Sequence, residues 1–228
     1  MGFTTAAPAP AASALPPLRP APDSRSRDAG SRLWEALGGV AVRSRSRAEQ
    51  ALLRQDEPQR RIFLVESGVV ELSCVAESGR ECVLDLVLPG EAFGGLVGET
   101  PFAAIAREEC QVLSAGPAEM QAARDARVAT AVTEMAQQRA LRLAERLREA
   151  LVLDSAERVM AVVSDLADRR STRTPEGRRV DVSITQEDLG RMTGCTRETV
   201  NRTLGPLLAE RRLLRRGRRF VVPYSVPP

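Results

Sequence analysis

The sequence predicts an α+β protein with a β-rich N-terminal domain, a long helix and a small C-terminal domain that mixes helices and strands. Residues 61–98 form short runs rich in Val, Ile, Leu and Phe, broken by turn signals at intervals of about 10 residues. From residue 117 the apolar positions change to helical spacing. The last third alternates helix and strand patterns and gathers arginines. A chain of 228 residues can form two modest domains, each with its own core.

The N-terminal region divides into a tail and a β domain. Residues 1–30 are rich in Ala and Pro but lack the basic start and compact apolar run of a signal peptide, so we expect a disordered tail. Residues 31–116 should form a small antiparallel barrel or sandwich, preceded by a short helical stretch at 32–42 and closed by a strand at 106–114. No apolar run approaches the roughly 20 residues of a membrane span, so we expect a cytoplasmic protein.

Residues 117–153 predict one long helix with an apolar stripe. The stripe recurs at steps of three and four, at Val132, Ala136, Ala140, Leu143, Leu147 and Ala150. A small β domain cannot cover so long a helix, and a second copy of the same helix is the economical partner. The sequence therefore favours a homodimer held by this stripe, with an intrachain core helix as the alternative.

Residues 154–228 predict a helix-turn-helix followed by a hairpin. A helix at 155–169 precedes a polar connection at 169–179 and a short strand at 180–184. Thr185 begins the next helix with a sequence like a capping box, Gly194 supplies the turn, and Thr196 is a good N-cap for a further helix. Two short apolar runs then flank Gly217 and predict a hairpin, or wing. This order is that of a winged helix-turn-helix.

The charge of the C-terminal domain points to a polyanionic partner. From Ser155 to Pro228 there are 15 arginines against 9 carboxylates, a balance of +6, which leaves −3 for residues 1–154 of a total of +3. Basic character concentrated in one domain is typical of nucleic-acid binding. A merely solvated basic surface is the alternative reading of the charge taken alone.

The helix after Thr196 has two different faces. At about 100° per residue, one arc holds Arg197, Glu198, Asn201 and Arg202. The opposite side holds Val200, Leu204 and Leu207, which can pack on the preceding helix. In a DNA major groove, arginine pairs with guanine and glutamate accepts from cytosine. The alternative is a solvated surface with a Glu198–Arg202 pair, which contributes only a few tenths of a kcal/mol.

Residue usage argues against an enzyme and against a metal or other cofactor. The chain has no histidine, which removes most acid–base and zinc chemistry. Its four cysteines, at positions 74, 82, 110 and 195, show no CxxC spacing. If the turn at Ser78-Gly79 is symmetric, residue 75 pairs with Cys82, so Cys74 and Cys82 project to opposite sides and a disulfide is disfavoured.

The stretch ITQEDLGRMTGCTRETVNRTLGPL resembles the helix-turn-helix of the cyclic-AMP receptor protein and fumarate-nitrate regulator (CRP/FNR) family, above all in its run G-C-[ST]-R-E-T-V-x-R-x-L. SGVVEL and LPGEAFG are similar to the family's β-roll, and the resemblance covers roughly residues 60–228. It implies a cyclic-nucleotide-binding-type β-roll, a dimerisation helix and a winged helix-turn-helix. The implied protein is a homodimeric transcription regulator that binds double-stranded DNA at a palindromic, TGTGA-like site.

The resemblance also implies roles for individual residues. Base readout falls to Arg197, Glu198 and Arg202, with Asn201 on the same arc. Candidate phosphate contacts are Thr185, Gln186, Thr196 and Thr199, together with the wing residues Arg216 and Arg218. The segment 169–177 lies where activators of the family touch RNA polymerase.

The ligand cassette departs from that of members that bind cyclic AMP. Those members hold the ribose with a glutamate and the phosphate with an arginine pair, whereas this chain has Gly95 at the glutamate position and Thr100 near the arginine pair. The predicted pocket is therefore degenerate, with Gly94, Gly95, Leu96, Thr100 and Arg107. A missing arginine forfeits a charge-assisted bond of about 1.5–3 kcal/mol, so we do not expect cyclic AMP to bind. Arg107 either replaces the lost guanidinium or points to solvent.

Several regulatory schemes stay open at this point. The absence of an N-terminal cysteine cluster and of histidine argues against the iron–sulfur and haem branches of the family, which leaves an unknown small ligand, a thiol response or no ligand. The alternative function is a nucleotide- or small-ligand-binding sensory module whose C-terminal domain docks protein. That alternative predicts weak, salt-insensitive DNA binding.

Overall fold

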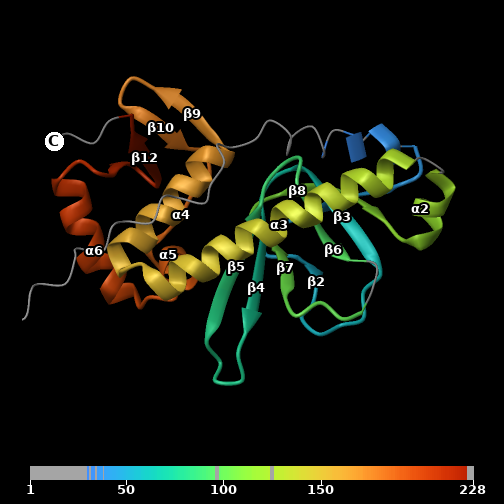
Figure 1. Cartoon of the computed structure of the whole chain (residues 1–228), viewed down its shortest axis with the longest axis horizontal. Helices are drawn as coiled ribbons and strands as arrows, with labels where there is room; N and C mark the ends of the chain where they lie inside the picture. Colours follow the sequence, from blue (N-terminus) through green and yellow to red (C-terminus); the bar gives the residue numbers. More distant parts are fainter. Residues whose placement is uncertain are drawn as a thin grey trace, which may run out of the picture.

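The computed structural model describes residues 30, 32–33, 35–37, 39–95, 98–123 and 126–224. The predicted tail, apart from Gly30, and the pocket residue Leu96 lie outside this set. A β domain and a smaller α/β domain sit side by side, and the long helix α3 (Ala126–Val152) runs across both (Figure 1). Within the described residues, no helix combines the length and apolarity that crossing a membrane requires.

The β domain consists of two four-stranded antiparallel sheets. Its strands are β1 (Val42–Ser46), β2 (Ala51–Leu53), β3 (Arg61–Ser67), β4 (Val70–Val75), β5 (Glu81–Val87), β6 (Ala92–Gly95), β7 (Ala103–Ala106) and β8 (Cys110–Ala115). The strand orders are β1-β8-β3-β6 and β2-β7-β4-β5. A shared apolar core includes Phe63 and Phe93, whose rings stack 5.0 Å apart. This confirms the predicted β-roll, although the single closing strand expected at 106–114 is divided between β7 and β8.

The β4–β5 hairpin corrects the predicted relation of two cysteines. Cys74 is the direct cross-strand partner of Cys82, and Val75 pairs with Glu81. The prediction assumed a two-residue turn, but Ala76 N–H donates to Arg80 O, which makes a three-residue loop and shifts the register. Directly opposite residues of an antiparallel pair point to the same face. The two thiols are therefore neighbours, and neither is in a disulfide.

The predicted helix at 117–153 is present as two helices. A short helix, α2 (Pro117–Ala123), follows β8, and α3 begins at Ala126. The N-terminal half of α3 packs on the β domain, where Val128, Ala131 and Met135 are buried beside Leu64 and Leu113. Farther along α3, the predicted stripe is not covered by the β domain.

The C-terminal domain confirms the winged helix-turn-helix. Its elements are α4 (Ser155–Arg169), β9 (Ser171–Thr174), β10 (Gly177–Val180), α5 (Gln186–Thr193), α6 (Arg197–Ala209), β11 (Leu214–Arg216) and β12 (Arg219–Pro223). One difference concerns segment 169–179, expected as a polar connection. It forms the hairpin β9–β10, because β10 pairs with β12 and extends the wing into a sheet of order β11-β12-β10-β9. The strand predicted at 180–184 accordingly ends at Val180.

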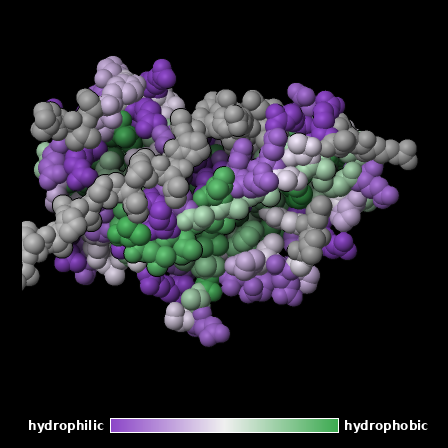
Figure 2. Space-filling model, in the orientation of Figure 1, coloured by the Kyte–Doolittle hydropathy of each residue, from purple (hydrophilic) through white to green (hydrophobic). Residues whose placement is uncertain are grey.

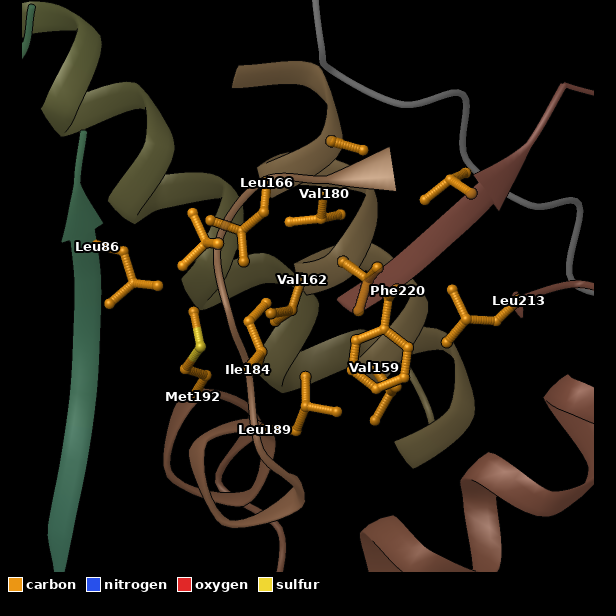
Figure 3. Packing of buried hydrophobic residues seen from close by; sticks show 14 of the residues in the cluster. Leu86, Val159, Val162, Leu166, Val180, Ile184, Leu189, Met192, Leu213 and Phe220 are labelled. Carbon is orange, nitrogen blue, oxygen red and sulfur yellow. The ribbon is translucent and has the colours of Figure 1, made fainter. Parts of the chain in front are cut away.

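One apolar cluster spans the two domains, in addition to the core between the two sheets. Val69, Val83, Leu86 and Leu88 of the β domain pack in a single cluster with residues of α4, α5 and α6. Figure 3 shows Leu86 of β5 on the same side of this cluster as Met192 of α5. Burial of these side chains on both sides stabilises one arrangement of the domains, since each fully buried aliphatic side chain contributes about 1.5–3 kcal/mol.

Candidate nucleic-acid interface

The helix-turn-helix is set by two caps and two glycines. Thr185 Oγ1 accepts the N–H of Asp188 at 3.0 Å, and the Asp188 carboxylate accepts the N–H of Thr185 at 2.8 Å, a reciprocal capping box. Gly194 ends α5 with φ of 70°, a left-handed conformation that disfavours other residues. A side chain at Gly190 would place its Cβ 2.9 Å from Cys195 O. The two helices thus approach closely at fixed geometry.

The second helix presents the predicted polar arc to solvent. Thr196 caps α6 by accepting the N–H of Thr199 at 3.2 Å. Val200, Leu204 and Leu207 are buried and belong to the same cluster as α5. The four candidate base-reading residues, Arg197, Glu198, Asn201 and Arg202, are all exposed. One side of α6 is therefore fixed to the protein while the other is open to a partner.

The candidate phosphate contacts differ in how accessible they are. Thr185, Thr196, Arg216 and Arg218 are exposed, whereas Gln186 and Thr199 are half-buried. Arg216 donates to Glu176 through Nε at 3.0 Å, so this wing arginine has a surface partner that a phosphate would have to replace. The hydrogen bond with Glu176 raises the pKa of Arg216. Exposed pairs of this kind contribute at most about 1 kcal/mol, so replacing Glu176 by a phosphate as the partner of Arg216 would cost little free energy.

The described residues of the predicted ligand pocket lie on separate segments of the chain. Gly94 lies on β6, where a Cβ would come within 2.4 Å of Arg61 O, and Gly95 follows it beside β3. Thr100 is buried. Arg107 does not point to solvent, since its side chain is 21% exposed and its guanidinium group is held by two carboxylates. It bonds to Glu71 and to Asp188 of the other domain.

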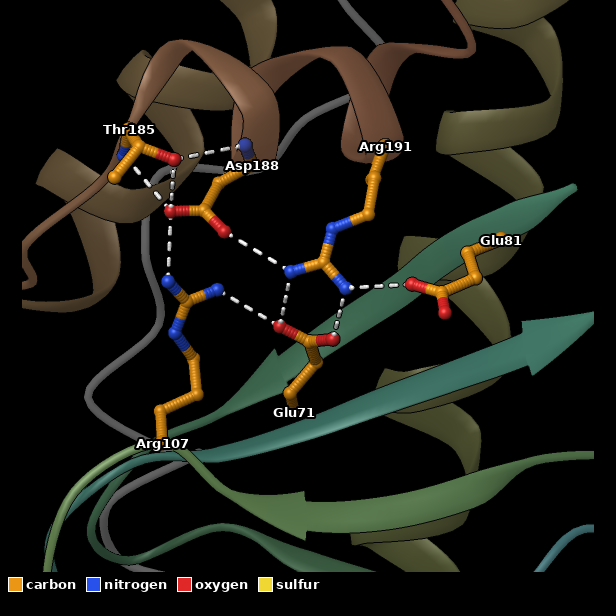
Figure 4. Close-up of polar contacts among 6 residues, drawn as sticks. All are labelled: Glu71, Glu81, Arg107, Thr185, Asp188 and Arg191. Carbon is orange, nitrogen blue, oxygen red and sulfur yellow. Dashed lines mark hydrogen bonds and ion pairs between the residues drawn. The ribbon is translucent and has the colours of Figure 1, made fainter. Parts of the chain in front are cut away.

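Arg107 belongs to an ionic cluster that we call the domain bridge, formed by Glu71, Glu81, Arg107, Asp188 and Arg191 (Figure 4). Arg107 Nη1 lies 2.8 Å from Glu71, and its Nη2 lies 2.7 Å from Asp188. Arg191 Nη1 reaches Glu71 at 2.9 Å and Glu81 at 3.3 Å, and Arg191 Nη2 reaches Asp188 at 3.0 Å. Strands β4 and β5 are thereby tied to the first helix of the helix-turn-helix.

The domain bridge changes the acidity of its members. Burial alone would raise the pKa of Asp188, but hydrogen bonds from Arg107 and Thr185 hold that pKa well below its usual range. Burial likewise opposes the charge on Arg107, and Asp188 together with Glu71 raises the pKa of Arg107. The capping residue of α5 is thus kept ionised by an arginine of the β domain.

Sequence reasoning missed this cluster because its members are far apart in the chain. Glu71 and Arg191 are 120 residues apart, and Arg107 and Asp188 are 81 apart. A weak signal existed in Glu71, a charged residue between Val70 and Leu72 in a strand whose other side chains are mostly apolar.

A second correction concerns Arg169, which the sequence placed in a polymerase-contacting loop. Its side chain is only 9% exposed, and it bonds inside the protein.

The predicted dimer stripe is largely open in the single chain. Ala136, Ala140, Leu143 and Leu147 are exposed, whereas Val132 is half-buried against the β domain. Hydrophobic residues gather over the part of α3 nearest α4 and α5 (Figure 2). The large exposed apolar side chains there are Leu141, Leu143, Leu147, Leu151 and Val152, between 42% and 76% exposed. An apolar patch of this kind marks an interaction site.

Comparison with known proteins assigns both domains. Residues 43–127 match the cyclic nucleotide-binding domain, and residues 157–223 match the Crp-like helix-turn-helix domain. The nitrogen fixation regulation protein FixK of Azorhizobium caulinodans is 32% identical over 179 residues, which are 74% of this chain and 68% of FixK. The cAMP-activated global transcriptional regulator Vfr of Pseudomonas aeruginosa is 26% identical over 196 residues, 79% of this chain and 88% of Vfr.

Solved structures show the same fold. FixK2 from Bradyrhizobium japonicum superposes with a TM-score of 0.69 at 26% identity, covering 80% of this chain and 92% of FixK2. The c-di-GMP responsive regulator CLP of Xanthomonas campestris gives a TM-score of 0.70 at 21% identity, covering 86% of this chain and 100% of CLP. The relatives are regulators of transcription and not enzymes. With both domain models matched and the same architecture in each neighbour, the chain belongs to the CRP/FNR family of DNA-binding transcription regulators.

Proposed function

We propose that the protein acts in the cytoplasm as a homodimer that binds a palindromic, TGTGA-like DNA site without requiring cyclic AMP. The observation that carries this proposal is the open polar arc on α6, opposite a fully buried face. Arg197 and Arg202 would donate to guanine O6 and N7, and Glu198 would accept from a cytosine amino group. Asn201 lies on the same arc and would contact an adjacent base.

Dimerisation is supported by the exposed stripe on α3. Two copies of α3 packed side by side would cover Leu143 and Leu147, and burying a fully exposed Leu contributes about 1.5–3 kcal/mol. Since Leu147 is 62% exposed in the single chain, about 1–2 kcal/mol is available from each copy of that residue. A two-fold pair of recognition helices then reads half-sites about 34 Å apart, one helical turn of DNA.

Independence from cyclic AMP is supported by the residues at the cassette. Gly95 has no side chain to hold a ribose, and Thr100 cannot replace an arginine toward a cyclic phosphate. Arg107, the nearest candidate replacement, is held by two carboxylates, so recruiting it to a ligand would break the domain bridge.

The proposal is tested by selecting bound sequences from a random duplex pool, with and without cyclic AMP. We expect one palindrome with G and C at the positions read by α6, unchanged by the nucleotide. Arg202→Ala should cost about 1–3 kcal/mol and relax one base position, whereas the wing variant Arg218→Ala should weaken all sequences alike. Recovery of no palindrome would favour a C-terminal domain that docks protein. Sharper selection at micromolar cyclic AMP would overturn the proposed independence.

The dimer is tested separately by light scattering of purified protein. Leu147→Glu places a charge in the proposed interface and should give a monomer with much weaker affinity for the palindrome. Val75→Glu is the matched control, since Val75 is 50% exposed but lies on the β4–β5 hairpin. Val75→Glu should leave the dimer intact, and a dimer that withstands Leu147→Glu would show that α3 is not the interface.

A further inference from the structure

We propose that three half-buried arginines on α3 form a binding site for a small oxyanion, such as phosphate or a phosphate monoester, at the junction of the two domains. The site consists of Arg139, Arg142 and Arg146, which lie beside Asp85 of β5 and Asp165 of α4. None of these arginines belongs to the degenerate cassette at Gly94, Gly95 and Thr100. We call the group the junction arginines.

The junction arginines share one face of α3. Residues three and four apart are neighbours on a helix, and positions 139, 142 and 146 follow this spacing. That face continues the one on which Val128, Ala131 and Met135 pack against the β domain, so the guanidinium groups enter the interior instead of the exposed leucine patch. Their side chains are only 16%, 23% and 16% exposed, in sequence order.

The carboxylates nearby are already bonded to a fourth arginine, Arg169 of α4. Arg169 lies 2.9 Å from Asp85, 2.6 Å from Glu91 and 3.1 Å from Asp165. It also donates to Leu86 O. Arg169 therefore holds the short, well-oriented contacts.

The junction arginines are left with longer contacts. The Nη2 atoms of Arg139 and Arg142 are each 3.7 Å from Asp85 Oδ2, and Arg146 Nη2 is 3.4 Å from Asp165 Oδ2. Charge-assisted hydrogen bonds from guanidinium to carboxylate measure about 2.7–2.9 Å. Four guanidinium groups thus face three carboxylates, and the positive excess falls on α3.

Several donors of the junction arginines have no acceptor. Among the described residues, the buried atoms without a hydrogen-bond partner include the nitrogens Arg139 Nη1 and Nη2, Arg142 Nε and Arg146 Nη1, and one acceptor, Asp85 Oδ2. This single oxygen, 3.7 Å from Arg139 and from Arg142, is too little to satisfy all of these donors. Arginine keeps its charge in proteins, so it cannot avoid this situation by losing a proton. Desolvation by burial lowers the pKa of Arg139, and the nearby Asp85 carboxylate acts in the opposite direction. Buried charge that is only partly neutralised is unfavourable, and an added anion would relieve it.

The chemistry of these donors selects the ligand class. Guanidinium groups match the oxygens of phosphate and carboxylate in two-point contacts, and four donor nitrogens from three side chains suit a tetrahedral oxyanion. Arg142 is the most exposed of the three and offers access from solvent. A bound oxyanion would join α3 to β5 and α4, which connects the dimer helix to both domains. An effect of the bound oxyanion on DNA binding rests on the proposed function, whereas binding of the oxyanion itself does not.

Binding is tested on the full-length protein with inorganic phosphate as the probe, by calorimetric titration and by thermal unfolding at fixed ionic strength against chloride. We expect phosphate to bind and to raise the unfolding temperature. Arg139→Met removes the least satisfied guanidinium while keeping an apolar stem, and it should weaken phosphate binding about tenfold or more. Without phosphate this variant should be about as stable as the wild type, because it removes a guanidinium group whose only contact with a carboxylate, at 3.7 Å from Asp85, is long.

Arg148→Ala is the matched control, since Arg148 lies on the same helix but pairs with Glu145 and takes no part in the junction. It should leave phosphate affinity unchanged. An equal thermal shift in chloride, or equal phosphate affinity in the wild type and Arg139→Met, would overturn the proposal. Loss of dimerisation in Arg139→Met without any phosphate binding would also overturn it, by assigning the site to a carboxylate of a second copy. DNA affinity, measured with and without phosphate, tests separately whether the bound oxyanion affects DNA binding.

Discussion

Removing Arg107 should loosen the attachment between the β domain and the helix-turn-helix. Arg107→Ala leaves Glu71 and Asp188, which are 5% and 4% exposed, without one of their two arginine partners. Breaking a buried ion pair costs about 3–5 kcal/mol when a charge is left unpaired. Here Arg107 is itself 21% exposed and Arg191 still bonds both carboxylates, so we expect a loss of about 2–3 kcal/mol.

Urea unfolding followed by circular dichroism measures this loss as a lower midpoint. Arg45→Ala is the matched control, because Arg45 pairs with Glu109 in a contact where the side chains are 66% and 59% exposed. Exposed pairs contribute roughly 0–1 kcal/mol, so the control should change the midpoint little. Hydrogen exchange should also rise in α5 in the Arg107 variant alone. If both variants shift the midpoint equally, the domain bridge does not carry the stability assigned to it.

Three further outcomes follow from the described geometry. The folded-state pKa of Asp188 is depressed, so ionised Asp188 contributes its full stabilisation above the unfolded-state pKa of about 3.9. This stabilisation is lost as the pH falls from there through the folded-state pKa, and the unfolding midpoint measured across acid pH should show the loss. Gly190→Ala should separate the two helices at Cys195 and abolish DNA affinity in a binding assay while the β domain stays folded, whereas unaltered affinity would contradict the close contact. The oxidant diamide should form a disulfide between Cys74 and Cys82, because directly opposite residues lie about 4.5–5.5 Å apart at Cα, within disulfide range. Peptide mapping of the oxidised protein that finds only intermolecular disulfides would contradict the register.

The helix-turn-helix could be predicted almost residue by residue. Its helices are short, their caps at Thr185 and Thr196 are local, and Gly194 marks the turn between them. The alternation of buried and exposed positions along α6 follows from helical period alone, so the arc that contains Arg197 and Arg202 was accessible without coordinates. The β-roll and the long helix were predictable as elements because their apolar periods differ.

Pairing and register were harder to predict. The sequence placed Cys74 and Cys82 on opposite faces because it assumed a two-residue turn, whereas one extra loop residue reverses the side on which a strand residue points. Segment 169–179 reads as a polar loop, yet it forms a hairpin because β12 offers an edge for β10 to pair with. The first outcome depends on the length of one loop, and the second on a partner more than 40 residues away in the chain, which local patterns do not reveal.

The sequence by itself determined the kind of elements and the exposed polar arc of α6, because caps, periods and residue identities are local properties. Only the tertiary structure decided what the remaining charges do. It brought Arg107 to Asp188 across the domain boundary, fixed Arg169 among three carboxylates, and left Arg139 half-buried at 3.7 Å from Asp85, whose other oxygen bonds to Arg169. The reason is physical: whether a charge is solvated, paired or unpaired depends on which surfaces meet, and in this protein two domains and one long helix meet at the same place.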